Sequence, residues 1–238
     1  MAKKKTVLQP KDFRPSQADL ATAPERAPKI NRVLAKTYPG ARTALEHENA
    51  LQLLIATILA AQSTDKRVNM VTKDLFRKYR SAKDFANADA AQLEDEIRST
   101  GFFRNKAKSI RTACRDIVEK HAGEVPDTME GLVGLAGVGR KTANVVLGEC
   151  FDAPGIIADT HVLRLSRLLG LSARPDDPVK LEQDLMKLLP RKEWTLFSHR
   201  LVFHGRNICI ARKPDCPHCP VRDLCPYGQL TAAQEPAT

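Results

Sequence analysis

Residues 135–142 read Leu-Ala-Gly-Val-Gly-Arg-Lys-Thr, a pattern that can bind phosphate and place an amine beside it. Gly137 and Gly139 permit a tight turn whose backbone N–H groups approach a ligand closely. A helix that begins after this turn points its positive end at the same place, which suits an anion. The stretch therefore predicts a phosphate-binding turn with Lys141 in the first turn of the following helix.

Lys141 has two interpretations. It can simply contact a phosphate, as many lysines of DNA-binding proteins do. The helix dipole and the neighbouring Arg140 also favour the neutral amine, which can attack as a nucleophile. Asp159 follows eighteen residues later in Ala-Asp-Thr-His. It can cap a helix, which contributes about 1 kcal/mol, and still serve catalysis, because capping fixes its carboxylate in place.

His161 in the same segment is a candidate site residue, although on sequence alone a partly buried polar side chain is the favoured interpretation.

A second candidate site is formed by cysteines near the C-terminus, in the pattern Cys209-x6-Cys216-x2-Cys219-x5-Cys225. In a reducing cytosol such clustering indicates a metal rather than disulfides. Four thiolates suit zinc or a [4Fe–4S] cluster. Zinc sites usually pair two short Cys-x-x-Cys units, whereas here one such unit is flanked by single cysteines. The spacing therefore favours iron–sulfur over zinc.

Four prolines, at 214, 217, 220 and 226, are expected to keep this segment out of helix and wrap it as a loop around the metal. Arg212 and Lys213 lie between the first two cysteines, and Arg222 precedes the last. Such cations on a rigid loop would form a second phosphate contact; solvated surface charge is the alternative.

The composition indicates the class of partner. The 238 residues carry a formal net charge of +10, which favours a polyanion such as nucleic acid, although solubility alone would also account for it. No apolar run is long enough to span a bilayer, and no apolar segment follows the basic N-terminus. We therefore expect a cytoplasmic protein.

Helical periodicity dominates the chain, and no region alternates apolar and polar residues as a strand does, so the expected fold class is all-α. From Phe103 onward, apolar residues recur at the spacing of one helix face, and Cys114 and Cys150 are expected as small core residues. Further helices are expected at 50–61, from Asp159 through Leu169, at 179–188 and at 194–208, with residues 143–147 buried. Residues 1–22 and 228–238 lack periodicity, so we expect flexible tails there, the first of them basic.

Residues 132–142 are interpreted as two short helices joined by the Gly-Val-Gly turn, which is a helix-hairpin-helix element. Such a turn presents backbone N–H groups to a DNA phosphate and reads no base sequence. A P-loop is excluded, because its glycines are more widely spaced and its lysine follows the second glycine directly.

Together these motifs resemble the endonuclease III family of DNA glycosylases. The resemblance covers residues 28–227 and is carried by residues 135–147, by Ala-Asp-Thr-His-Val at 158–162 and by the four clustered cysteines. It implies that these cysteines bind a structural [4Fe–4S] cluster rather than zinc. It also implies two all-α domains with the DNA cleft between them. One is a helical barrel at about 43–153, with the hairpin at about 128–150; the other, which holds the cluster, joins 23–42 to 154–227.

The resemblance also implies DNA contacts outside the hairpin. Family members flip a damaged base out of the duplex, and Gln62 matches the residue that fills the vacated space. Phe102 matches the intercalating residue, where other members carry a smaller aliphatic group. The plainer interpretations are a polar helix-end residue and a core aromatic. The expected DNA-binding residues are Gln62, Phe102, Gly137, Gly139, Arg140, Thr142, His161 and Lys213.

The implied activity is that of a bifunctional glycosylase and AP lyase on oxidised pyrimidines or abasic sites in double-stranded DNA, performed by a nucleoid-associated bacterial monomer. Lys141 would attack C1′, displace the base and form a Schiff base, after which β-elimination cleaves the strand on the 3′ side. Asp159 would help to deprotonate Lys141 and stabilise positive charge on the sugar.

Two alternatives stay open. One is a monofunctional adenine glycosylase of the same superfamily, although those relatives lack a lysine at the Lys141 position and carry an additional C-terminal domain. The other is a DNA-binding module without enzymatic activity, which would bind duplex but release no base.

Overall fold

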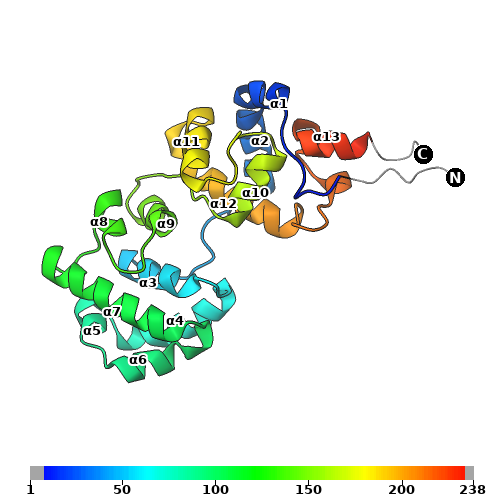
Figure 1. Ribbon diagram of the computed structural model, residues 1–238. Helices are drawn as coiled ribbons and strands as arrows, with labels where there is room; N and C mark the ends of the chain where they lie inside the picture. Colours follow the sequence, from blue (N-terminus) through cyan, green and yellow to red (C-terminus); the bar gives the residue numbers. More distant parts are fainter. Residues whose placement is uncertain (1–7, 234–238) are drawn as a thin grey trace. The chain divides into compact units, whose positions relative to one another are not determined.

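The structure, a computed structural model, describes residues 8–233 and is helical throughout, with no strand in that range (Figure 1). The α-helices are α1 (Gln17–Ala21), α2 (Ala23–Thr37), α3 (Ala50–Ala60), α4 (Asp65–Lys78), α5 (Ala82–Ala86), α6 (Ala90–Glu96), α7 (Phe103–Lys120), α8 (Met129–Val133), α9 (Arg140–Cys150), α10 (Thr160–Leu168), α11 (Pro178–Leu188), α12 (Trp194–Asn207) and α13 (Pro226–Ala232). Short 3₁₀ helices are η1 (Arg98–Thr100), η2 (Arg191–Glu193), η3 (Cys216–His218) and η4 (Arg222–Leu224). The all-α expectation is confirmed.

The chain divides into two compact units, which are described separately. One unit is Thr43–Ala153, and the other joins the described parts of Met1–Arg42 and Pro154–Thr238. None of the helices in the described part of the chain is long and apolar enough to cross a membrane.

The unit Thr43–Ala153 is organised around α7, which packs against α3, α5 and α6 (Figure 1). The buried side of α7 carries Ala107, Ile110, Cys114 and Ile117, four of the five residues whose spacing predicted this helix; the fifth, Phe103, is half-buried. Cys114 is 1% exposed, and burial raises the pKa of its thiol to about 12. It is therefore a neutral core residue, as expected, whereas Cys150, for which the same was expected, is only half-buried at the end of α9.

Three helices of this unit that the apolar pattern did not predict have clear N-terminal caps. Thr64 accepts a hydrogen bond from the Arg67 N–H at the start of α4, and Ser81 and Asp89 do the same for α5 and α6. Such caps satisfy N–H groups that a helix start leaves without a partner. The signal for these helices therefore lay in the caps rather than in long periodic runs.

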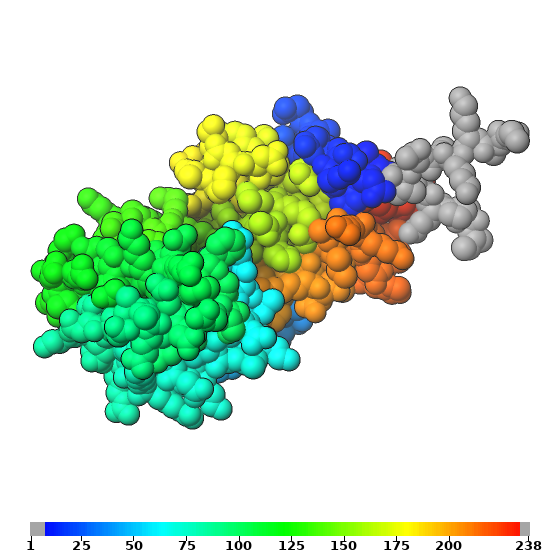
Figure 2. Space-filling view, turned by 60° about the horizontal axis from the view of Figure 1, so that its bottom comes forward, coloured from blue at the N-terminus to red at the C-terminus, as the bar shows by residue number. Residues whose placement is uncertain are grey.

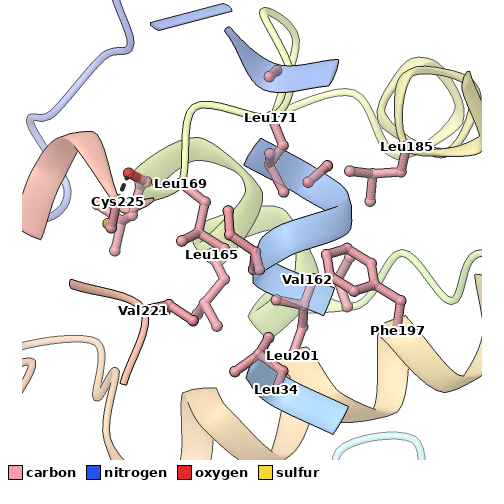
Figure 3. Close-up of a cluster of buried hydrophobic side chains, with 14 of the residues drawn as sticks. Leu34, Val162, Leu165, Leu169, Leu171, Leu185, Phe197, Leu201, Val221 and Cys225 are labelled. Carbon is pink, nitrogen blue, oxygen red and sulfur yellow. Dashed lines mark hydrogen bonds between the residues drawn. The ribbon is translucent and has the colours of Figure 1, made fainter. Parts of the chain in front are cut away.

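The other unit packs α2, α10, α11 and α12 around an apolar core (Figure 3). Its side chains at 0–1% exposure include Leu34, Val162, Leu165, Leu185, Phe197 and Leu201. Burying each large side chain of this kind contributes about 1.5–3 kcal/mol. Val221 and Cys225 join the same core, so the cysteine-rich segment is packed onto the helices.

Residues 8–22 are not the flexible tail that the sequence predicted. Phe13 is 6% exposed, and its ring centroid lies 5.5 Å from that of Tyr227 in an edge-on arrangement. The Tyr227 hydroxyl donates to the Leu8 carbonyl at 3.0 Å. Figure 2 shows this N-terminal segment, in blue, against the orange and red C-terminal one. A single aromatic anchor and a five-residue helix produce no periodic pattern, so periodicity did not predict the packing of this segment.

The C-terminal expectation is also corrected. Helix α13 continues to Ala232, and Gly228 is buried, where a tail from residue 228 was expected. Pro226 begins this helix rather than preventing it. The N–H group of the first helical residue has no partner within the helix, so a proline there removes no hydrogen bond. The remaining parts of both predicted tails, residues 1–7 and 234–238, lie outside the described residues.

Candidate functional site

The predicted hairpin forms between α8 and α9, which pack against each other. Leu132, Leu135 and Val138 anchor it, at 0%, 4% and 7% exposure, and the Val138 N–H donates to the Leu135 carbonyl at 3.1 Å. These apolar anchors leave Arg140 and Lys141 exposed at the start of α9. The structure thus brings the predicted residues of this stretch together on one turn: Gly137, Gly139, Arg140, Lys141 and the half-buried Thr142.

The two hairpin glycines differ in why the structure accommodates glycine at each position. Gly137 has a φ of +77°, and a Cβ there would lie 2.8 Å from the Ser109 Cβ on α7. Gly139 has a φ of −96°, with open space around the Cβ position, and its backbone stands at the N-cap of α9. No side chain caps α9, so its first N–H groups stay accessible to a phosphate.

Gly137→Ala is expected to lower the free energy of unfolding of its unit by about 1–3 kcal/mol, because alanine at this φ is strained and meets Ser109. Gly139→Ala is the matched control and is expected to cost less than about 1 kcal/mol, since its φ and surroundings tolerate a methyl group. Urea denaturation of both variants checks this. Equal losses of stability would show that Gly137 has no special conformational role.

Gln62 and Phe102 lie on two loops of the same unit, in a backbone conformation that non-glycine residues rarely adopt. Their φ values are +55° and +48°, and only Ala122 and Asp152 share this feature among the non-glycine residues from 8 to 233. Phe102 is 63% exposed, which excludes its interpretation as a core aromatic. Strained backbone and exposed side chains of this kind occur frequently at functional sites.

Asp159 lies in the other unit, at the N-cap of α10. Its Oδ1 accepts a hydrogen bond from the Val162 N–H at 2.8 Å, and the side chain is half-buried. The predicted helix start is therefore correct. The cap fixes the carboxylate relative to α10 and leaves Oδ2 for other partners.

His161 is half-buried in the first turn of α10. Burial lowers the pKa of its imidazole, an effect that the nearby Asp159 opposes and Arg164 and Arg206 reinforce. Its Nδ1 lies 3.3 Å from an Arg164 guanidinium nitrogen. Gly205 makes room for the ring, because a Cβ there would lie 2.6 Å from Nδ1.

Arg164 is a residue of this region that the sequence did not single out. The same guanidinium nitrogen donates to the Gly205 carbonyl at 3.1 Å and to the Cys209 carbonyl at 2.8 Å. It thereby ties α10, which Asp159 caps, to the backbone of the first clustered cysteine. Arginines are common on amphipathic helices, so the sequence alone does not indicate that this one contacts distant backbone carbonyls.

The clustered cysteines line one cavity with an empty volume of about 370 Å³, part of which opens to solvent. Leu165, Leu168 and Tyr227 also line it, so its surroundings are largely apolar. Burial raises the pKa of the Cys209 and Cys225 thiols to about 12. Buried thiols such as these two are costly to ionise alone but become stable thiolates when metal ions supply positive charge, and thiolates are the ligands that iron–sulfur clusters use.

His204 supports this cavity from α12. Its Nε2 lies 3.4 Å from the Cys219 Sγ, and its Nδ1 lies 3.1 Å from the Tyr38 hydroxyl. Burial lowers the pKa of His204 to about 4, so the ring is neutral and has one N–H to donate. One ring nitrogen of the neutral imidazole donates and the other accepts, so His204 can hydrogen-bond with both the Tyr38 hydroxyl and the Cys219 sulfur.

Lys213, the last of the predicted DNA-binding residues, is exposed with Arg212 between Cys209 and Cys216. The segment is held by a hydrogen bond from the Asp215 N–H to the Ile208 carbonyl at 3.0 Å. Lys213 thus lies on the cysteine-rich loop of the same unit as Asp159 and His161.

Comparisons with known proteins agree with this description. Residues 55–191 match the HhH-GPD superfamily of base excision DNA repair proteins, and residues 209–225 match the iron–sulfur binding domain of endonuclease III. Endonuclease III of Synechocystis sp. is 51% identical over 213 residues, which cover 89% of this chain and 97% of that protein. Endonuclease III of Bacillus subtilis is 44% identical over 192 residues, covering 81% and 88%.

Solved structures show the same likeness. A trapped endonuclease III–DNA covalent intermediate is 43% identical, with a TM-score of 0.83 over 88% of this chain and 98% of that chain. A thermostable thymine-DNA glycosylase at 21% identity and a TM-score of 0.79 shares the fold.

Fold, hairpin and cysteine-rich segment therefore define a DNA glycosylase of the helix-hairpin-helix superfamily of base excision repair. Within that superfamily, the chain belongs to the endonuclease III family. It is accordingly a DNA glycosylase with AP lyase activity that binds a structural [4Fe–4S] cluster.

Proposed function

We propose that this protein removes oxidised pyrimidines from duplex DNA and cleaves the strand 3′ to the abasic site, with Lys141 as the nucleophile. The observation that carries the proposal is the exposed amine in the first turn of α9, beside a hairpin whose helix start no side chain caps. A relative has been solved as a trapped covalent DNA intermediate, which supports an enzyme-bound step of this kind. A nucleophilic side chain can form such a bond, and an amine suits the C1′ carbon.

Lys141 Nζ attacks C1′ of the flipped nucleotide, and the glycosidic bond breaks with its electron pair leaving on the base. Loss of the nitrogen proton and opening of the sugar ring give the protonated Schiff base. A proton then leaves C2′, and the electrons expel the 3′ phosphate oxygen, which breaks the strand. Water finally hydrolyses the Schiff base and restores the lysine. The Asp159 carboxylate acts as the base that takes a proton from the Lys141 amine, and it stabilises the positive charge that develops on the sugar.

The remaining residues hold the duplex. The Gly137 and Gly139 turn, with Arg140 and Thr142, binds phosphate through backbone and side-chain donors and does not read the bases. Gln62 fills the space of the flipped nucleotide, and Phe102 intercalates beside it.

His161 and Lys213 add contacts to the DNA backbone from the other unit. We further propose that the protein acts as a monomer on the bacterial nucleoid.

The test measures base release and strand cleavage separately on three duplexes: one with thymine glycol, one with adenine opposite 8-oxoguanine, and one undamaged. The proposal predicts both products from the thymine-glycol duplex alone. Release of adenine without strand cleavage would favour the monofunctional relative. Tight binding of all three duplexes without any product would favour a non-enzymatic DNA-binding module.

We also propose that Cys209, Cys216, Cys219 and Cys225 are the cluster ligands. Cys216→Ser is expected to lower the iron content and the visible absorbance of the purified protein, because a serine oxygen is a poor ligand for this cluster. The half-buried Cys150 lies in the other unit, and Cys150→Ser is expected to keep both at the level of the original protein. Loss of iron in both variants alike would contradict the assignment.

A further inference from the structure

Lys106 is a buried lysine that neither the hairpin nor the cysteine-rich segment uses. It lies in the first turn of α7 at 5% exposure, and burial lowers the pKa of its amine. Its Nζ donates to the Leu59 carbonyl at 2.7 Å and to the Thr100 carbonyl at 2.8 Å. A buried ammonium group is rare, and it is retained only where polar partners satisfy it.

The two acceptor carbonyls belong to the two loops that carry Gln62 and Phe102. Leu59 stands in the last turn of α3, three residues before Gln62. A continuing helix would bring the Ser63 N–H to the Leu59 carbonyl, but that N–H donates to Ala60 instead, at 3.1 Å. The Lys106 amine thus replaces a backbone donor that is lost where α3 ends.

The second carbonyl belongs to Thr100, the last residue of η1, two residues before Phe102. The backbone N–H of Lys106 also donates to the Phe102 carbonyl, at 3.1 Å. Lys106 therefore holds the Phe102 loop on both sides, with its backbone after the aromatic residue and its side chain before it. Gly101, with a φ of +72°, turns the chain between these two contacts.

Both loops need such support, because their backbones are strained. Gln62 and Phe102 have φ values of +55° and +48°, and conformations of this kind persist only where the surroundings fix them. Helices α3 and α7 pack against each other, so the amine joins the two loops within one unit (Figure 1). An apolar side chain would fill the same space without joining the carbonyls.

We propose that Lys106 is a positioning residue that holds Gln62 and Phe102 at a fixed separation for insertion into DNA. The inference rests on the proposed function of these two residues and adds a role for a side chain that does not touch the substrate. Insertion at two points of one base pair step requires that both loops approach together. The bridge from Lys106 presets that spacing before DNA binds.

The test uses a duplex with 2-aminopurine opposite a tetrahydrofuran abasic analogue, whose fluorescence rises when the base is unstacked. Lys106→Met is expected to reduce the rise at saturating protein to the level of Gln62→Ala and Phe102→Ala. On a thymine-glycol duplex, kcat is expected to fall by about 10- to 100-fold, the range for a misplacement of ~1 Å. The affinity for duplex changes little, because no phosphate contact is removed.

Lys120→Met is the control, since Lys120 lies exposed at the other end of α7 and pairs only with Asp116 on its own helix. It is expected to match the original protein in every readout. Lys106→Gln is the second variant if Lys106→Met does not fold: its side chain is shorter and its amide nitrogen has two N–H donors instead of three, so a smaller loss in the same readouts is expected.

The outcomes separate the inference from the proposed function. A full fluorescence rise and unchanged kcat in folded Lys106→Met, with only its melting temperature lowered, would overturn the positioning role. A full rise in Gln62→Ala and Phe102→Ala would instead contradict their insertion into DNA, and the inference would fall with it. A loss of the fluorescence rise in Lys106→Met, Gln62→Ala and Phe102→Ala, but not in Lys120→Met, supports both the insertion of the two residues and the positioning role of Lys106.

Discussion

Lys141→Gln is expected to abolish base release and strand cleavage on damaged duplex, with a fall in kcat of roughly 10³-fold or more, as befits loss of a nucleophile. Glutamine keeps a polar side chain of similar length but cannot form a Schiff base. The residue is exposed on α9, so its replacement leaves no buried group without a partner. Single-turnover assays of base release and strand cleavage measure the effect.

Binding distinguishes the nucleophile from a phosphate contact. Because hairpin backbone and other cations remain, the affinity of Lys141→Gln for an abasic-analogue duplex is expected to fall less than about tenfold. Lys187→Gln, at an exposed lysine of α11, is the control for the loss of one positive charge. Product formation at near-normal rates by Lys141→Gln, with binding alone weakened, would mean that Lys141 only contacts phosphate.

Asp159→Asn is expected to reduce kcat by about 10²- to 10⁴-fold while leaving stability nearly unchanged. Asparagine caps helices about as well as aspartate, so the hydrogen bond to the Val162 N–H can be kept while the charge is removed. The variant therefore separates the chemical role of the carboxylate from its structural one. Steady-state kinetics and urea denaturation provide the two measurements.

Asp159→Ala completes the comparison. It loses both charge and cap, and its free energy of unfolding is expected to fall by a further ~1 kcal/mol relative to Asp159→Asn. Normal activity in Asp159→Asn, with a defect only in Asp159→Ala, would show that Asp159 is a helix cap and nothing more.

The sequence predicts those parts of the fold in which one helix buries a periodic apolar face. Helix α7 is such a case, because Ile110 and Ile117 recur at helical spacing. Helix α10 was predicted from its cap at Asp159, which the structure places as expected. The packing of residues 8–22 was missed, because it depends on one ring, Phe13, that meets a tyrosine more than two hundred residues away.

The residues of the candidate site can be predicted only where they form a motif of residues close together in the sequence. The hairpin glycines and the clustered cysteines are such motifs, and the resemblance to a family rests on them. Lys106 and Arg164 were not predictable in this way, because both act through backbone carbonyls of residues far away in the sequence. A carbonyl acceptor leaves no side-chain signature, so only the folded chain reveals these contacts.

Lys141 is expected to bond covalently to the damaged nucleotide during turnover. Borohydride reduction on a thymine-glycol duplex, followed by proteolysis and mass spectrometry, detects this bond. We predict a reduced adduct on the peptide that contains Lys141, and none in Lys141→Gln. An intact protein that releases base without a trapped adduct, or with the adduct on another amine, would contradict the account.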